Sequence, residues 1–383
     1  MKRALVFGFI SGALFRADVR SQNATFAITY GGFTPEAQTA FQYAADIWSR
    51  YLISEVPIKV NAKMVFLLPG QLGITFPNGE KNFPGAPHAD VWYASCLANA
   101  LAGEELNPGE MDIDVFLNST ANWYYGTDGN PAADAYDLVS TVLHELCHGL
   151  GFLSLANKIG TDGSFGMIYA ESFSPLVTSF AWPELDTLPG AFDIWLRNGA
   201  GVDLLDMENP SDALGLEVTS NNIFLESPEV LAANAGEAGR IYAPSTFTLG
   251  SSLSHWNEGT YPTGDPNEFM TPFAADGNAN HDPGPLTLAV LKEIGWEIDT
   301  ATSVHTASPS NITLFPNPAS NILYISGISS AYRSEVRIYN MLGELMLVEN
   351  DTSAIPISTL VPGVYTVYLR AGDNELAVRL LKK

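Results

Sequence analysis

One predicted helix carries a motif that constrains the whole chain. Residues 136–152 read YDLVSTVLHELCHGLGF, and their apolar side chains recur at helical spacing: Leu138, Val142 and Leu146. His144 and His148 are four residues apart in this helix, so both imidazoles face the same side. Two such imidazoles can bind one Zn²⁺ ion at about 2.0–2.1 Å. Glu145 would then lie beside the metal, where it can act as a general base toward water.

A catalytic zinc ion needs a third protein ligand and one open coordination position. The elongated motif HExxHxxGxxH matches as far as Gly151, but its last position is Ser154, so the third ligand must be remote. Gly149 and Gly151 are predicted to end the helix and, in a left-handed conformation, to turn the chain back beneath the metal. This early end disfavours Glu171 as a third ligand from a second helix. The remaining histidines are His88, His255, His281 and His305.

The stretches HELCHGLGF and LSHWNEGTYPTGDPNEFMTP together resemble the leishmanolysin-like branch of the metzincin zinc endopeptidases. In that family a long insertion follows the motif, and the third zinc histidine comes shortly before a methionine turn. The resemblance implies a zincin-like α+β domain in which His144, His148 and His255 bind zinc, Glu145 is the general base, and Met270 lies under the site. His281 remains the competing third ligand, since imidazole is the expected donor and distance along the sequence does not decide which residue reaches the metal.

The surrounding sequence predicts α+β structure. Thr34, Pro35 and Glu36 form a helix start, and an apolar face continues to Leu52. Residues 58–67 alternate as a strand whose predicted buried side chains are Ile58, Val60, Ala62, Met64 and Phe66.

Three further segments complete the expected first domain. Residues 112–119 form a second predicted strand, which we take as the sheet edge where an extended substrate would pair. Residues 286–298 are predicted to form a closing helix, and residues 154–248 show no clear period.

The acidic balance of the chain excludes some partners. Residues 22–304 contain 35 Asp and Glu against 8 Lys and Arg, whereas residues 305–383 contain six of each kind. Binding nucleic acid or anionic lipid requires clustered Lys and Arg, so we expect no nucleic-acid partner. No segment after the first residues offers the roughly 20 apolar residues of a membrane-spanning helix.

The chain begins with a pattern typical of secretory signal peptides. Lys2 and Arg3 precede an apolar run over residues 4–15. We expect cleavage after Ser21 rather than after Ala17, and a protein that is secreted or held at the cell surface.

Two groups of side chains leave alternatives open. Cys96 and Cys147 can form a disulfide outside the cytoplasm, or both can be buried thiols. A further set of side chains could bind a structural Ca²⁺ ion or could simply cap turns. This set consists of Asp112, Asp114, Asn118, Asp128 and Asn130.

The last segment reads as a separate unit. Residues 299–311 are small and polar, as in a linker, and short alternating strands follow (NILYIS, EVRIYN, GVYTVYLR, ELAVRLL), which predict a small all-β, Ig-like sandwich. Residues 312–383 resemble the type A sorting domain of the Bacteroidetes type IX secretion system, which implies that this secretion machinery is a partner. Carbohydrate binding is the rival role for a small β module. Against it, the aromatic residues alternate as strand-core residues do: Tyr324, Tyr339, Tyr365 and Tyr368.

The sequence therefore predicts a signal peptide (1–21), a zinc metallopeptidase domain (22–298), a linker (299–311) and a sorting domain (312–383). The expected function is a secreted zinc endopeptidase that hydrolyses protein or peptide substrates, with Glu145 as general base. One alternative is a catalytically inactive binding or adhesion protein on the same scaffold, against which the intact HExxH motif argues. Another is a zinc hydrolase that acts on a substrate other than a peptide.

Overall fold

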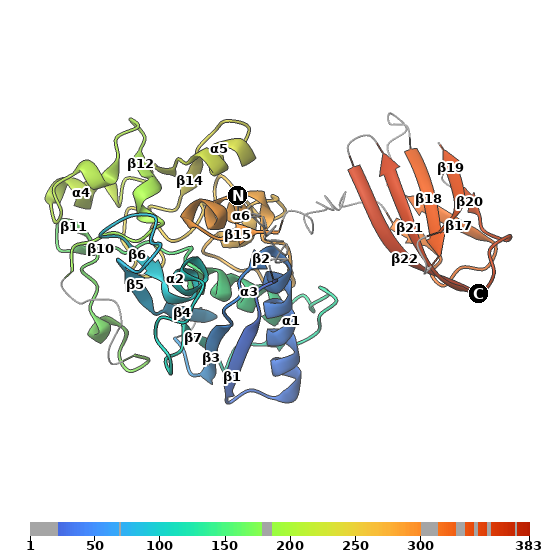
Figure 1. The fold of residues 1–383 in the computed structure, drawn as a ribbon, viewed down its shortest axis with the longest axis horizontal. Coiled ribbons are helices and arrows are strands. Elements are labelled where there is room, and N and C mark those ends of the chain that lie inside the picture. The colour runs from blue at the N-terminus through green and yellow to red at the C-terminus, as the bar shows by residue number, and fades with distance from the viewer. Residues whose placement is uncertain are drawn as a thin grey trace, which may run out of the picture. The chain divides into compact units, whose positions relative to one another are not determined.

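The structure is a computed structural model whose chain divides into two compact units, one ending at Asp299 and the other beginning at Thr300 (Figure 1). It describes residues 22–68, 70–177, 186–299, 313–326, 334–340, 344–350, 354–371 and 374–383. The predicted signal peptide, and all of the predicted linker except Asp299, lie outside the described residues.

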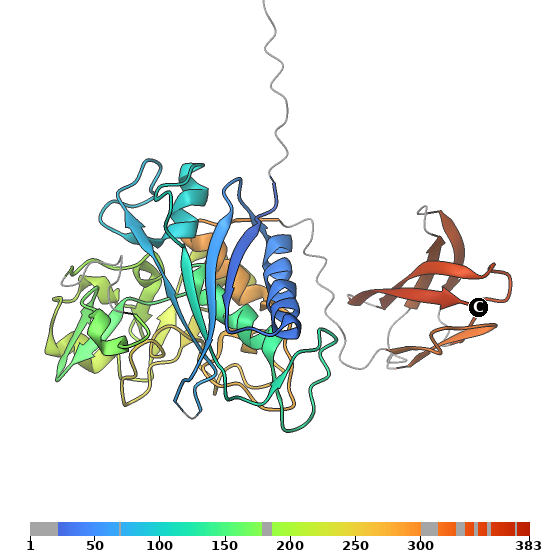
Figure 2. The ribbon, with the colours of Figure 1, turned by 90° about the horizontal axis from the view of Figure 1, so that it is seen from below.

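A four-stranded sheet with the order β1-β3-β7-β4 forms the centre of the first unit (Figure 2). Strands β1 (Phe26–Gly31), β3 (Ile58–Val65) and β7 (Ile113–Asn118) are parallel, and β4 (Gly73–Pro77) pairs with β7 in the antiparallel direction. The expectation that residues 112–119 form the edge strand is wrong. Strand β7 is internal because β4 pairs along its outer side, and β4 is the edge.

Two helices share a core with this sheet. Helix α1 (Pro35–Tyr51) begins as predicted, with the Thr34 hydroxyl accepting a hydrogen bond from the Ala37 amide at 3.3 Å. Helix α3 (Leu138–Gly149) packs against α1, β7 and β4. The Trp48 indole of α1 donates a buried hydrogen bond of 2.9 Å to the Leu143 carbonyl of α3. The motif-bearing helix therefore packs against both α1 and the sheet.

Two predicted elements end earlier than expected. Strand β3 stops at Val65, and Phe66, predicted to be buried, is 68% exposed because it lies beyond the last paired residue. The predicted helix over 286–298 is α6 (Gly284–Ile294), which ends before Gly295, a residue with φ of +125°. The chain then forms β15 (Glu297–Ile298), which pairs with β2 (Leu52–Ile53).

The rest of the first unit consists of short elements, which explains why its sequence shows no long period. Its helices are α2 (Ser95–Ala102), α4 (Asp212–Glu217) and α5 (Pro228–Ala233), with 3₁₀ turns η1 (Ala170–Phe173), η2 (Asp193–Trp195), η3 (Leu204–Asp206) and η4 (Glu268–Met270). Its remaining strands are β5 (Gly79–Lys81), β6 (Trp92–Ala94), β8 (Trp123–Tyr124), β9 (Tyr136–Asp137), β10 (Ala156–Ile159), β11 (Asp162–Phe165), β12 (Leu196–Asn198), β13 (Ile223–Leu225) and β14 (Gly239–Ile241).

Both cysteines of the first unit are free and buried, so of the two alternatives the structure has buried thiols. The Cys96 thiol lies 3.4 Å from the Gly149 carbonyl oxygen at the end of α3. Burial raises the pKa of both thiols.

The second unit is rich in β structure, with two sheets ordered β16-β17-β20 and β19-β18-β21-β22. The strands are β16 (Thr313–Phe315), β17 (Ile322–Ser326), β18 (Ser334–Asn340), β19 (Leu345–Asn350), β20 (Ala354–Pro356), β21 (Gly363–Ala371) and β22 (Asn374–Lys382). The buried core is mainly aliphatic, and Tyr365 is its one tyrosine among the described residues. The expectation for the other three tyrosines is wrong, because Tyr324 is 42% exposed and Tyr339 and Tyr368 are half-buried.

A mixed α and β unit is thus followed by a β-rich unit. In the described parts of the chain, we find no helix with the length and apolar character needed to cross a membrane.

Candidate metal centre

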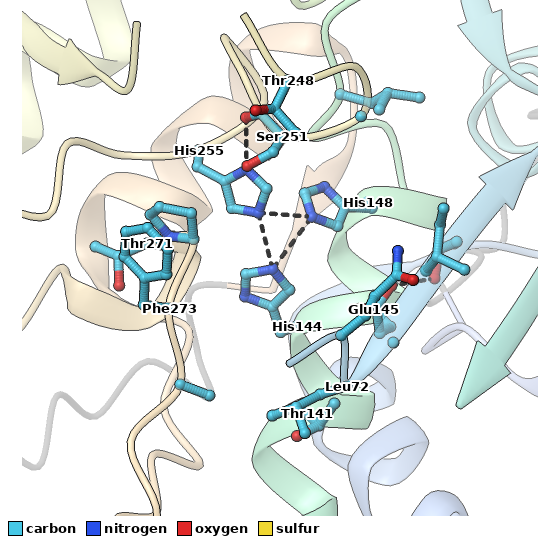
Figure 3. A pocket seen from close by; sticks show the side chains of 18 of the residues that line it. Leu72, Thr141, His144, Glu145, His148, Thr248, Ser251, His255, Thr271 and Phe273 are labelled. Carbon is cyan, nitrogen blue, oxygen red and sulfur yellow. Dashed lines mark hydrogen bonds between the residues drawn. The ribbon is translucent and has the colours of Figure 1, made fainter. Parts of the chain in front are cut away.

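Three histidine side chains converge on one point in the first unit (Figure 3). The Nε2 atoms of His144 and His148 are 3.1 Å apart, and each lies 3.2 Å from Nε2 of His255. Four tetrahedral ligands at about 2.0–2.1 Å from a zinc ion would be about 3.3–3.4 Å apart, so this triangle has the right size for three of them. Within the described residues, it is the one group of three or more His, Cys, Asp or Glu side chains close enough to hold a metal ion.

The opposite ring nitrogen of each histidine faces a backbone carbonyl, so each Nδ1–H can donate a hydrogen bond. The pairs are His144 with Phe269 at 3.0 Å, His148 with Phe152 at 2.8 Å and His255 with Ser251 at 2.8 Å. A proton on Nδ1 leaves the lone pair of Nε2 directed at the common point. The backbone thus selects the tautomer that a metal ion requires.

Burial also keeps these imidazoles neutral. It lowers the pKa of His144 to about 4 and that of His255 to about 3. Burial, and then the neighbouring His255 and His144, lower the pKa of His148 well below its usual range. Neutral imidazole is the form that ligates metals, so the cluster is ready to bind a cation at neutral pH.

Of the two glycines predicted to end α3 and turn the chain, Gly151 makes the turn. The helix ends at Gly149, and Gly151 has φ of +109°, a backbone conformation that favours glycine. This turn directs the Phe152 carbonyl back to His148. A Cβ atom at Gly149 would lie 2.6 Å from Cγ2 of Ile113, so the helix end packs closely on the central strand β7.

Long-range hydrogen bonds bring His255 to the helix. The Ser154 amide donates to the Ser254 hydroxyl at 3.1 Å, and the Trp256 amide donates to the Met270 carbonyl at 2.8 Å. The two contacts flank His255 on either side. Met270, predicted to lie under the site, is fully buried, and its backbone anchors the segment that carries the third histidine.

The other candidate ligands lie elsewhere. Nε2 of His281 is 2.7 Å from the Asp137 carboxylate at the N-terminus of α3, so the structure brings His255, and not His281, to the other two histidines. Glu171 is exposed on η1, and His88 is exposed. His305 lies outside the described residues.

Glu145 lies beside the histidine triangle, on the side of strand β4 (Figure 3). Its carboxylate is buried and accepts a hydrogen bond from the Thr75 hydroxyl at 2.6 Å. Burial raises the pKa of Glu145 to about 7, and the hydrogen bond from Thr75 partly opposes this rise. Thr75 was not predicted as a site residue, although a short apolar run between Gly73 and Pro77 is a recognisable strand signal.

A cleft of about 410 Å³ opens beside the cluster. Strand β4 lines one part of it, and residues 248–251 and 271–275 line another. No Lys or Arg is among its described lining residues, and its charged lining residues are Asp137, Glu145 and Glu268.

The side chains considered for a structural Ca²⁺ ion are engaged in hydrogen bonds. Asp112 accepts from the Lys59 amide, the Ser95 hydroxyl and the Asn99 amide group at 2.8–3.1 Å. Asp114 pairs with Asn61, Asn118 caps the turn at Thr120, and Asp128 accepts from Tyr124 and Asn130. The contacts of Asn118 and Asp128 fit the turn-capping alternative, whereas Asp112 and Asp114 bond to residues of β3 and α2 instead.

Comparison with known families identifies the second unit. Residues 313–383 match the family model of the secretion system C-terminal sorting domain. The second unit is a type IX secretion sorting domain. This sorting domain implies interaction with the type IX secretion machinery and places the protein at the cell surface or outside the cell.

The comparisons say less about the first unit. Residues 104–187 match a family model described as SPBPB7E8-like, and this stretch includes all of α3. A search of curated proteins returned no match for the chain.

Proposed function

We propose that the first unit is a zinc-dependent endopeptidase with a zincin-like fold, related to the leishmanolysin-like metzincins. One observation carries the proposal: three neutral imidazoles, two of them buried and that of His144 half-buried, converge at 3.1–3.2 Å beside the buried carboxylate of Glu145, in an open cleft. Export by the sorting domain fits an enzyme that acts on proteins or peptides outside the cell.

The residues present fit a zinc ion. His144, His148 and His255 supply three nitrogen donors of suitable spacing, and the adjoining cleft leaves a fourth position accessible. When bound there, zinc would supply a Lewis acid that makes water more acidic and polarises the carbonyl of the scissile bond.

Glu145 would transfer a proton from the attacking water to the leaving amine. Its carboxylate takes one proton from the attacking water as the oxygen bonds to the carbonyl carbon. It then returns that proton to the amine that leaves when the C–N bond breaks. In the metal-free site, burial raises the pKa of Glu145 to about 7, toward the range in which a general base is most effective.

Strand β4 supports a peptide substrate over a small molecule. It pairs with β7 on one side, and within the described residues no strand pairs with its other side. A strand at the edge of a sheet can add an extended peptide as a further strand. Because β4 also lines the cleft, a peptide paired with it would pass beside the three histidines.

The test is cleavage of a quenched fluorescent protein substrate by the secreted chain, with bound zinc measured on the same samples. We compare the native protein, the native protein with a zinc chelator, and Glu145→Ala. We expect cleavage that the chelator abolishes, and a loss of about 10²–10⁴-fold in Glu145→Ala, which should retain its zinc.

Two outcomes would reject the proposal in different ways. A folded protein with bound zinc and no cleavage of any peptide would favour a hydrolase for another substrate, or a binding protein. A folded protein that binds no zinc would remove the chemical basis of the proposal.

A further inference from the structure

We propose that Thr75 is a positioning residue that holds the Glu145 carboxylate for catalysis, and that Gly73 provides the space in which that carboxylate sits. The inference rests on the proposed peptidase function. It adds that the edge strand β4 has two roles, because the strand that would pair with the peptide also holds the general base.

The first observation is the contact between the two side chains. The Thr75 hydroxyl donates to Oε2 of Glu145 at 2.6 Å, the short distance typical of a hydroxyl bonded to a charged carboxylate. Both residues are buried, with Thr75 8% and Glu145 6% exposed. Since Thr75 engages one oxygen, the orientation of the carboxylate is set and its other oxygen remains available for the reaction.

The second observation is independent of that hydrogen bond. Gly73 is two residues before Thr75 on β4, so both positions face the same side of the strand. A Cβ atom at Gly73 would lie 2.5 Å from Oε1, 2.7 Å from Cδ and 2.8 Å from Cγ of Glu145. Any side chain at this position would push the carboxylate away.

The fold makes this arrangement rigid. Gly73 and Thr75 are paired with Leu117 and Val115 of β7, and α3, which carries Glu145, packs against both strands. Strand β4 would then contact the peptide along its outer edge and the Glu145 carboxylate through Gly73 and Thr75. The position of β4 would therefore determine the distance between Glu145 and the scissile bond.

The experiment compares three variants of the secreted chain. In Thr75→Val a methyl group replaces the hydroxyl, and we expect kcat to fall about 10–100-fold, with KM and bound zinc little changed, as is typical when a residue that orients a site residue is lost. Thr75→Ser retains the hydroxyl, and we expect activity within about threefold of the native protein. Gly73→Ala should also lower kcat, since its Cβ would displace the carboxylate.

A double-mutant cycle supplies a readout other than activity. The unfolding equilibria of metal-free native protein, Thr75→Val, Glu145→Ala and the double variant measure the coupling between the two side chains. We expect a coupling equivalent to about tenfold or more in the unfolding equilibrium constant, since a hydrogen bond to a charged group contributes this much.

The outcomes separate this inference from the proposed function. If the native protein is active and Glu145→Ala is not, the function stands. Native kcat in Thr75→Val, or equal losses in Thr75→Val and Thr75→Ser, would then overturn the inference alone. A coupling of less than about twofold would overturn it as well, because the contact would not orient the carboxylate.

Discussion

The two parts of the candidate metal centre are built in different ways. His144 and His148 come from a single helix, where a four-residue spacing is enough to place both imidazoles on one side. His255 comes from a segment 107 residues beyond His148, held by contacts with Ser154 and Met270. Local geometry thus supplies two histidines of the triangle, and long-range packing supplies the third. The positions of His144 and His148, the helix-borne half of the site, should tolerate changes elsewhere in the fold. The position of His255, the loop-borne half, should not.

The largest expected effect comes from removing the loop-borne ligand. His255→Ala leaves two protein ligands, so we expect bound zinc to be lost and peptidase activity to fall by about three orders of magnitude or more. Metal analysis and cleavage assays on the same sample measure both. His281→Ala is the matched control and should keep its zinc, because His281 pairs with Asp137 instead. The reverse pattern would show that the third ligand has been misassigned.

Acidification should destabilise the metal-free protein. Burial lowers the pKa of His144 to about 4 and of His255 to about 3, so between pH 6.5 and 5 the unfolded chain binds protons that the folded chain does not. The stability these histidines contribute is therefore complete above pH 6.5 and is lost as the pH falls. Glu145 and Asp193 act in the opposite sense, since burial raises their pKa values to about 7 and about 6.

On acidification, the loss of stability caused by the histidines should exceed the gain caused by Glu145 and Asp193. We expect the free energy of unfolding to fall by about 1–2 kcal/mol per pH unit between pH 6.5 and 5, measured by urea denaturation in the presence of chelator. Saturating zinc should oppose the loss at pH 6.5, because it binds the neutral imidazoles of the folded state. A stability that is constant over this range would contradict the buried, neutral histidines.

A smaller effect on stability and zinc affinity should follow from a change that weakens the support of the His255 segment without replacing a histidine. The Ser154 hydroxyl donates to the fully buried carboxylate of Asp193 at 2.6 Å, and the Ser154 amide donates to Ser254 beside His255. Ser154→Ala would deprive that carboxylate of one donor, which should lower the free energy of unfolding by about 1–3 kcal/mol. We also expect zinc affinity, measured by competition with a chelating dye, to weaken by about tenfold.

The exposed Ser172 offers a control for this change. Ser172→Ala should leave both stability and zinc affinity within experimental error of the native values. If Ser154→Ala behaved in the same way, the segment that carries His255 would not depend on the contact between the Ser154 hydroxyl and Asp193, and the contrast between the two parts of the site would weaken.

The smallest expected effect concerns a purely local feature. Thr34→Ala removes the N-cap of α1 and should lower the free energy of unfolding by about 1 kcal/mol. Zinc affinity and activity should stay unchanged, because a cap acts on its own helix. Thr39→Ala, an exposed change within the same helix, is the control and should have less effect on the denaturation midpoint. A loss of zinc in Thr34→Ala would show that even local features of the first helix reach the site.

Two fold predictions were right where one element contains all the information, and two were wrong where a partner strand decides. The start of α1 and the helix end at Gly149 follow from capping and glycine chemistry within a few residues. The position of β7 inside the sheet depends on β4, a separate segment, and chain order suggested the wrong edge. Phe66 continued the alternation of β3, but alternation alone does not show where pairing stops.

The sequence by itself determined a helix with His144 and His148 on one side and a neighbouring carboxylate, and a separate C-terminal sorting domain, because the residues that define each lie close together along the chain. Only the tertiary structure decided that His255 completes the triangle, that His281 pairs with Asp137, and that Thr75 contacts Glu145. The physical reason is that the spacing within a helix fixes the direction of its side chains. Contacts across 70 or more residues, as between Thr75 and Glu145, depend instead on which surfaces pack together.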